Sequence, residues 1–261
     1  MSDSLKSEPR RGSRRQPEAS RNAILEAALA EFAQEGLAGA RVDAIADAAG
    51  VNKALLYYYF EDKETLYGAT LDRFFAPLHQ RILAVCSQPG TAGERFLTYA
   101  REHFDAIAAS PHYARIFMGE LMSASRGGKT HLDRIMQKYM LSIGQGIFGL
   151  MQEGIRTGEF RPVNPSQSIP STIGSIVHYF LTAPLRQRFM HLMPIPEPPI
   201  EERRAAVLDF IAAALFADRE AGTRLAAQIA SSEKPSSTAV PASGAAQKHR
   251  TSARHGKGGR K

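Results

Sequence analysis

The sequence has only one cysteine, Cys86, among its 261 residues. A single cysteine excludes an intramolecular disulfide and any metal site built from several cysteines, and it favours the cytoplasmic location that we expect. No apolar run approaches the roughly 20 residues of a membrane-spanning helix. The charged first residues also lack the apolar centre of a signal peptide. We therefore expect a protein that makes no use of a membrane.

Motifs that carry chemistry are also missing. His79, His103, His112 and His131 do not follow the spacing of metal ligands, so we expect no metal site. The segment 144–149 matches G-x-G-x-x-G, but no strand precedes it, and small residues for close helix packing explain it better. With no nucleophile–base pair and no phosphate loop, we expect no catalytic residue, no cofactor and no enzymatic activity.

The net charge of +7 is unevenly distributed along the chain. Residues 1–21 hold six basic side chains against three acidic ones, and residues 231–261 hold seven against one. Within 22–67, in contrast, three basic side chains stand against eight acidic ones. Any long-range attraction to DNA must therefore come largely from the two ends of the chain, with only a few cations in between.

The stretch 42–60 contains two short helical patterns that meet at Gly50. Glycine supplies the permissive backbone that a sharp turn between helices needs, and Asn52 is a good N-cap for the second helix. The first pattern has apolar residues at i, i+3, i+4 and i+7, which form one buried face: Val42, Ile45, Ala46 and Ala49. Two helices around such a turn are typical of a helix-turn-helix unit.

The second of these helices has an unusual outward surface. Leu56 and Phe60 point inward at 100° per residue. Lysine neutralises phosphate, tyrosine hydroxyls bind phosphate oxygens, and alanine or leucine contacts a thymine methyl group. The outward and flanking positions hold these residue types: Lys53, Ala54, Leu55, Tyr57, Tyr58 and Tyr59. This surface predicts a recognition helix that lies in the major groove of double-stranded DNA.

The run from Arg21 to Phe74 resembles the N-terminal DNA-binding domain of the TetR (tetracycline-repressor) family of bacterial regulators. It covers about a fifth of the chain. The resemblance implies a transcriptional regulator, most often a repressor. The residues that carry it are Ile24, Ala27, Phe32, Gly36, Val42, Ile45, Ala46, Ala49, Gly50, Val51, Lys53, Leu56, Tyr57, Tyr59, Phe60, Lys63, Glu64 and Leu66.

The resemblance also implies which residues contact DNA, and it includes Lys63 at the family's phosphate-binding position. The sequence departs from the family at two places. Ala40 stands where a capping Thr or Ser is usual, and Glu61 would repel phosphate if it faced the DNA. The expected DNA-binding residues are Arg41, Asn52, Lys53, Ala54, Leu55, Tyr57, Tyr58, Tyr59 and Lys63.

The remainder of the chain reads as helices separated by Pro and Gly breakers, with no convincing strand. We predict an all-α fold of about nine helices, the first running from Ser20 as its N-cap to Gly36 as its C-cap. The expected divisions are a disordered basic arm at 1–19, a helix-turn-helix domain at 20–67, a helical ligand-binding and dimerisation domain at 68–230, and a disordered basic tail at 231–261. The arm either enters the minor groove, as the resemblance implies, or is a solvated tail.

A homodimer on a palindromic operator is expected, because one helix-turn-helix unit reads too few base pairs for specificity. The family pairs through its last two helices. Here two apolar stripes favour that interface, although either could be internal core. The first stripe is Ile173, Ile176, Val177, Phe180 and Leu181, and the second is Val207, Leu208, Ile211, Leu215 and Phe216.

The middle helices are rich in Met and aromatic residues, which line many adaptable pockets. The family commonly binds small molecules there, so a small-molecule effector of unknown identity is expected. Plain core packing is the competing explanation for each residue. The candidate ligand-binding residues are Phe104, Phe117, Met118, Met122, Tyr139, Met140, His178 and Tyr179.

Two other functional classes stay open. A weakly specific DNA-coating or architectural protein would bind through its basic ends and would lose binding when 1–19 and 231–261 are removed. An all-α enzyme with an incidental helix-turn-helix would need a catalytic motif that the sequence does not show. The preferred hypothesis is a ligand-responsive repressor.

Overall fold

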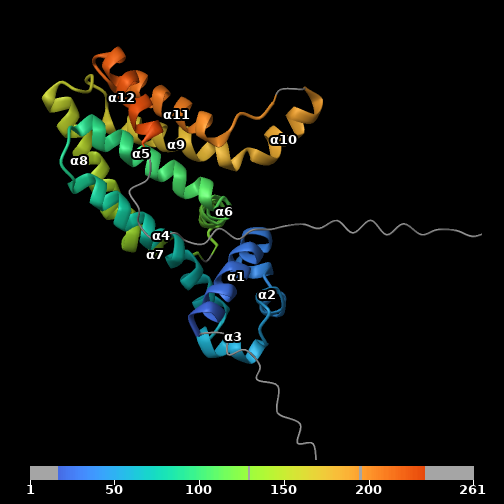
Figure 1. Ribbon diagram of the computed structural model, residues 1–261. Coiled ribbons are helices and arrows are strands. Elements are labelled where there is room, and N and C mark those ends of the chain that lie inside the picture. Colours follow the sequence, from blue (N-terminus) through green and yellow to red (C-terminus); the bar gives the residue numbers. More distant parts are fainter. Residues whose placement is uncertain (1–16, 129, 194–195, 233–261) are drawn as a thin grey trace, which may run out of the picture.

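The computed structural model describes residues 17–128, 130–193 and 196–232 as helices and the links between them (Figure 1). The N-terminal helices are α1 (Pro17–Gly39), α2 (Val42–Ala49) and α3 (Lys53–Tyr59), and the long α4 (Lys63–Ser87) leads away from them. The other elements are α5 (Ala92–Ala109), α6 (His112–Ser125), α7 (Leu132–Ile135), the π-helical turn η1 (Met136–Met140), α8 (Leu141–Thr157), α9 (Pro165–Leu181), α10 (Ala183–Leu192), α11 (Ile200–Leu215) and α12 (Arg219–Ser231).

The predicted all-α fold is confirmed, although the described part of the chain has twelve α-helices rather than about nine. One additional boundary separates α9 from α10 at Thr182. Another separates α11 from α12, because Phe216 is extended and the Asp218 side chain accepts a hydrogen bond from the Ala221 N–H at 3.0 Å. An aspartate in this position starts a new helix, α12.

The first helix begins earlier than predicted. α1 starts at Pro17, and Ser20, the expected N-cap, is buried inside the helix. Residues 17–19 are therefore helical, whereas 1–16 of the expected arm and 233–261 of the expected tail lie outside the described residues. At Gly36 the backbone leaves the helical conformation, with φ 68° and ψ 175°, and the helix then resumes to Gly39.

The buried side chains form two clusters that share α4, which we call the first core and the second core. The first surrounds the helix-turn-helix unit and also receives Tyr113 and Ile116 of α6, Ile135 of α7, and Tyr139 of η1. The second lies among the C-terminal half of α4, α5, α8, α9, α11 and α12. The N-terminal unit is therefore not packed against α4 alone. Apolar contacts tie it to α6 and to the α7–η1 segment, so a displacement of these elements can reach the DNA-binding helices.

The second of the two predicted dimer stripes is internal core. Val207, Leu208, Ile211, Leu215 and Phe216 are each at most 5% exposed. They are covered within the chain, because α5 and α12 pack against α11. The interface prediction was wrong for this stripe. In α9, Ile176 is fully buried, while Ile173, Val177, Phe180 and Leu181 are half-buried.

Candidate DNA-binding site

The turn between α2 and α3 depends on Gly50. This residue lies in the left-handed region with φ 65° and ψ 37°, and its N–H donates to the Asp47 carbonyl at 3.1 Å. The Val51 N–H then donates to the Ala46 carbonyl at 3.0 Å, which completes a helix C-cap. A side chain at position 50 would strain this conformation by about 1–2 kcal/mol. The predicted role of Gly50 is therefore visible in its backbone.

The inward face of α3 is anchored in the first core. Leu56 is fully buried, and Phe60, just after the helix, is 1% exposed. The Asn52 side chain accepts a hydrogen bond from the Leu55 N–H at 2.7 Å, so it caps the helix as expected. With its first turn capped and one face buried, this seven-residue helix is held in position by its neighbours rather than by its own propensity.

The opposite face of α3 is open to solvent. Tyr58 is 80% exposed and Tyr57 is 42% exposed, while Ala54 is also exposed and Leu55 is half-buried. Tyr59 lies against Tyr58, with ring centroids 5.3 Å apart in an edge-to-face arrangement. The predicted outward residues thus share one accessible surface, which is the geometry that a recognition helix requires.

Lys53 is already paired within the chain. Its Nζ lies 2.8 Å from Oδ1 of Asp43, in the first turn of α2, and both side chains are more than half exposed. The hydrogen bond and the charge of Lys53 lower the pKa of the Asp43 carboxyl, and the same contact raises the pKa of Lys53. A DNA phosphate that approaches Lys53 must therefore compete with a carboxylate.

The two other predicted cations are held in different ways. The Lys63 Nζ donates to the carbonyls of Ala38 and Ala40, both at 3.2 Å, so it ties the start of α4 to the link between α1 and α2. An ammonium has three donors, which leaves one for a phosphate. The Arg41 backbone N–H donates to Glu31 at 2.9 Å, and the Arg41 side chain is exposed.

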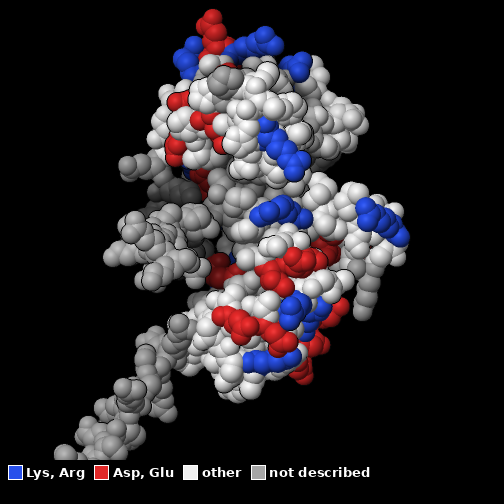
Figure 2. All heavy atoms as spheres, turned by 90° about the vertical axis from the view of Figure 1, so that its right-hand side faces the viewer, with Lys and Arg blue, Asp and Glu red and all other residues white. Residues whose placement is uncertain are grey.

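Acidic side chains surround these cations. Figure 2 shows Asp and Glu beside the few Lys and Arg over the lower part of the molecule, where α1 to α3 lie. Asp62 caps α4 by accepting from the Thr65 N–H at 2.7 Å, and this hydrogen bond lowers its pKa. Glu61 is exposed. The negative charge counted in the sequence is thus located beside the predicted DNA-binding residues.

We expect Asp43→Asn to tighten DNA binding about two- to fivefold at low salt, because it releases Lys53 and removes a carboxylate from the binding face. The dissociation constant should be measured by fluorescence anisotropy at several salt concentrations. Asp47→Asn is the matched control, since it removes the same charge from α2 without an ion pair to Lys53. An equal gain in both variants would contradict a specific effect of the Asp43–Lys53 pair.

A buried polar junction connects this site to the second half of the chain. The Glu120 carboxylate of α6 accepts a hydrogen bond from the Tyr67 hydroxyl of α4 at 2.7 Å and from the His131 N–H at 2.5 Å. The His131 ring lies 2.8 Å from Glu64, in the first turn of α4. The sequence analysis missed Glu120, because a lone glutamate in an amphipathic helix normally faces solvent.

A second polar contact lies one turn farther along α4. Asp72 accepts hydrogen bonds from Tyr139 at 2.6 Å, from Arg134 at 2.5 Å and from Lys138 at 3.1 Å. Burial alone would raise the pKa of Asp72, but these three donors outweigh it and lower the pKa. The α7–η1 segment is therefore fastened to α4 by charge as well as by apolar packing.

The candidate ligand-binding residues are not brought together. Phe117 and Tyr139 each pack against Phe75 in the first core, with ring centroids 5.9 Å apart in both pairs. Phe104 instead contacts Phe180 in the second core, at 5.0 Å. Met140 touches both cores. The others lie nearer the surface: Met118 and Met122 are 36% and 46% exposed, His178 is exposed, and Tyr179 is covered by the guanidinium group of Arg186 at 3.7 Å.

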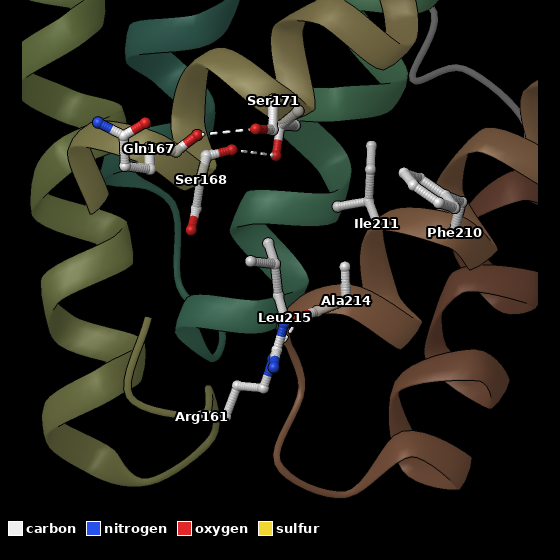
Figure 3. Close-up of a pocket in the computed structure, with 9 residues that line it drawn as sticks. Arg161, Gln167, Ser168, Ser171, Phe210, Ile211, Ala214 and Leu215 are labelled. Carbon is white, nitrogen blue, oxygen red and sulfur yellow. Dashed lines mark hydrogen bonds between the residues drawn. The ribbon is translucent and has the colours of Figure 1, made fainter. Parts of the chain in front are cut away.

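A groove of about 210 Å³ lies elsewhere, between α9 and α11 (Figure 3). Gln167, Ser168 and Ser171 line it on the α9 side, and Phe210 and Ile211 line it on the α11 side. None of the eight candidate ligand-binding residues lines it. The sequence analysis did not identify this groove, because its walls come from two helices that are distant in sequence.

Related proteins match both the N-terminal unit and a larger part of the chain. Residues 24–70 match the model of the bacterial regulatory proteins of the tetR family. The HTH-type transcriptional regulator RutR of Escherichia coli K12 is 31% identical over 170 residues, which cover 64% of this chain and 76% of RutR. The chain belongs to the TetR family. It is a helix-turn-helix, DNA-binding transcription regulator.

Other TetR-family relatives match over shorter stretches or in fold alone. The HTH-type transcriptional repressor SCO4008 of Streptomyces coelicolor is 49% identical over 59 residues, 23% of this chain and 31% of SCO4008. A gamma-butyrolactone receptor of solved structure has a TM-score of 0.60 at 16% identity and covers 82% of this chain and 98% of its own. At 16% identity, this similarity shows that the two proteins share a fold and nothing more.

Two further features of this TetR-family chain concern what the described residues lack. They contain no helix with the combined length and apolar character that crossing a bilayer requires. The same residues hold no group of three or more His, Cys, Asp or Glu side chains that could bind a metal ion.

Proposed function

We propose that this TetR-family regulator is a ligand-responsive repressor that binds a palindromic operator as a homodimer. The observation that carries the proposal is the two-sided α3. Leu56 and Phe60 fix one face in the core, while Tyr57, Tyr58 and the other outward residues remain accessible. A helix held in this way can enter the major groove without unfolding its own domain.

Lys53 and the tyrosine hydroxyls would bind phosphate oxygens on either side of the groove, which sets the register of the helix. Ala54 and Leu55 would contact base edges, with thymine methyl groups as their natural partners. The Arg41 side chain and the remaining donor of Lys63 would add phosphate contacts from the flanks. These residues are the same set that the sequence analysis proposed, together with the capping Asn52.

Dimerisation would place two such helices in successive major grooves, with half-sites roughly 34–36 Å apart or a multiple of this distance. The outer surfaces of α9 and α11 support the pairing. Phe210 is 63% exposed there, beside the groove shown in Figure 3, and Gly174 offers a site for close approach. In a two-fold pair, the protruding phenylalanine of each copy can pack into the groove of the other.

The effector would act by shifting a conformational equilibrium rather than by touching the DNA. Its most direct route runs through α6, because Glu120 joins that helix to Tyr67 near the start of α4. A coupling of about 1–3 kcal/mol would change operator affinity by roughly 5- to 150-fold. The effector is expected to be a small organic molecule, as for the gamma-butyrolactone receptor of the same fold.

Footprinting on the DNA that flanks its own gene, with excess nonspecific competitor at physiological salt, tests the proposed repressor. A protected palindrome that survives competition is the expected result. Diffuse protection that the competitor removes would oppose sequence-specific binding. If removal of 1–16 and 233–261 also abolished that diffuse protection, the basic ends would be the binding elements, as in the architectural alternative.

Once an operator is known, Lys53→Ala should reduce the slope of log affinity against log salt by about one ion, since one phosphate contact is lost. Tyr57→Phe should weaken binding by removing a hydroxyl donor, with little change in that slope. Both dissociation constants can be measured by anisotropy over a range of salt. Unchanged binding in both variants would show that α3 is not the recognition helix.

A further inference from the structure

Helix α10 exposes an apolar stripe that no described residue of the chain covers. None of its residues is buried, and Leu185, Phe189 and Leu192 are 53%, 54% and 79% exposed. Their spacing of i, i+4 and i+7 places all three on one face of the helix. A ten-residue helix is marginal in water on its own, so its stability depends on what packs against this face.

The direction of α10 is set by contacts at its N-terminal end. The guanidinium group of Arg186 stacks on the Tyr179 ring at 3.7 Å and binds Glu197 at 3.1 Å. Arg203 of α11 lies over the same ring at 4.8 Å. These contacts join the end of α9, the start of α10 and the link before α11, and α10 extends beyond the body of the molecule (Figure 1). The stripe is therefore held away from the cores of its own chain.

Unpaired charges of opposite sign lie on this part of the surface. Within the described residues, Arg188 of α10 forms no ion pair, and α10 contains no acidic residue. In the first turn of α11, Glu201 and Glu202 are exposed and likewise unpaired within those ranges. Ile200 precedes them and is 38% exposed. A surface with an apolar and basic helix beside an apolar and acidic helix end is complementary to a copy of itself.

Two-fold pairing makes use of this complementarity. In an isologous interface every contact between two different elements occurs twice, so α10 of each copy can meet the first turn of α11 of the other. Leu185, Phe189 and Leu192 would then cover apolar surface around Ile200, and Arg188 would approach Glu201 and Glu202. Figure 2, which faces the side from which α10 projects, shows an upper surface that is mostly uncharged at its centre, with separate basic groups on it and acidic groups at its top and along one side.

We propose that α10 is a clasp that docks on the first turn of α11 in a second copy of the chain. The inference rests on the homodimer proposed above and adds a specific contact to it. The clasp extends the pairing beyond the outer faces of α9 and α11. It also explains why a helix with no buried residue carries a regular apolar stripe.

The double variant Leu185→Asp, Phe189→Asp tests the clasp by sedimentation equilibrium of the full chain. We expect the dimer dissociation constant to rise at least about tenfold, because two large apolar side chains per subunit lose their burial. The melting temperature of the monomer, measured at low protein concentration, should not change, since neither residue is buried within the chain. Leu141→Asp, at a residue 60% exposed in α8, is the matched control and should leave dimerisation unaltered.

Charge reversal provides the second measurement. Arg188→Glu should weaken the dimer, and adding Glu201→Arg with Glu202→Arg should restore it. If the α10 variants dimerise as tightly as the wild type, the clasp alone is overturned. If the wild type is a monomer at micromolar concentration, the homodimer is overturned as well. Sedimentation of the wild type with anionic vesicles, lost in the α10 double variant, would assign the stripe to a lipid surface and also overturn the clasp.

Discussion

Replacing Leu56 by alanine should lower the free energy of unfolding by about 2–5 kcal/mol, the usual range for a fully buried leucine. Leu56 is 0% exposed and belongs to the core that holds α1, α2 and α3 together. The same core includes Ala46 and Phe60, and a closely packed core relaxes only partly around a cavity. Urea unfolding followed by circular dichroism gives the change directly.

Leu55→Ala is the matched control for that variant, since it makes the same chemical change one position earlier on the same helix. Leu55 is half-buried and lies on the outward side of α3. This variant should keep nearly all of the stability and should lose DNA affinity. The pair therefore separates folding from recognition. Equal losses of stability would show that the two faces of α3 are not distinct.

The periodicity of the sequence predicted the helix-turn-helix well, because its constraints are local. Gly50 must adopt a positive φ and Asn52 must cap α3, and each requirement is met within a few residues of the chain. The burial of Leu56 involves more distant helices, but the helical period alone indicates which face of α3 points inward. The positions of these three residues could therefore be predicted without the tertiary structure.

The same reasoning failed where two long-range choices give the same pattern. An apolar stripe such as Val207, Leu208 and Ile211 appears identical in sequence whether a partner subunit or the chain itself covers it. In this chain α5 and α12 cover the stripe of α11. The sequence analysis did not identify α12, which is the helix that decides between the two possibilities.

The partners of charged side chains within the chain were the other feature that the sequence did not predict. Asp43 binds Lys53 across the turn at 2.8 Å, which the sequence analysis did not predict. Lys63 was predicted at a phosphate and binds two carbonyls of the chain. Long polar side chains choose their partners from the finished fold, and a sequence pattern does not contain those distances. The predicted DNA-binding cations Lys53 and Lys63 are thus already bound to groups of their own chain.

Tyr67→Phe should destabilise the protein by about 1–3 kcal/mol, because the buried Glu120 carboxylate loses a hydroxyl donor at 2.7 Å. Burial and the Glu120 carboxylate raise the pKa of Tyr67, so the hydroxyl is protonated and can donate throughout the physiological range. The variant keeps the ring, which packs edge-to-face on Phe32 at 4.8 Å. Its effect on unfolding, measured in urea, therefore reports the hydrogen bond.

Tyr113→Phe supplies the comparison that identifies the role of charge. The Tyr113 hydroxyl also joins α6 to α4, but it donates to the neutral carbonyl of Thr70 at 3.2 Å. We expect a smaller loss, about 0.5–1.5 kcal/mol, since a hydrogen bond to a neutral group contributes less than one to a carboxylate. Similar losses in the two variants would mean that the charge of Glu120 adds nothing to the junction.

The Tyr67 and Tyr113 variants also test whether the junction transmits a signal. If Glu120 holds the start of α4 in the DNA-binding arrangement, Tyr67→Phe should weaken operator binding under conditions in which the protein stays folded, and Tyr113→Phe should do so less. The reason is that Tyr67 lies one turn after Lys63, whereas Thr70 lies farther along α4. Unchanged operator affinity in the folded Tyr67→Phe variant would leave Glu120 a purely structural role and would exclude this junction as the path from effector to DNA.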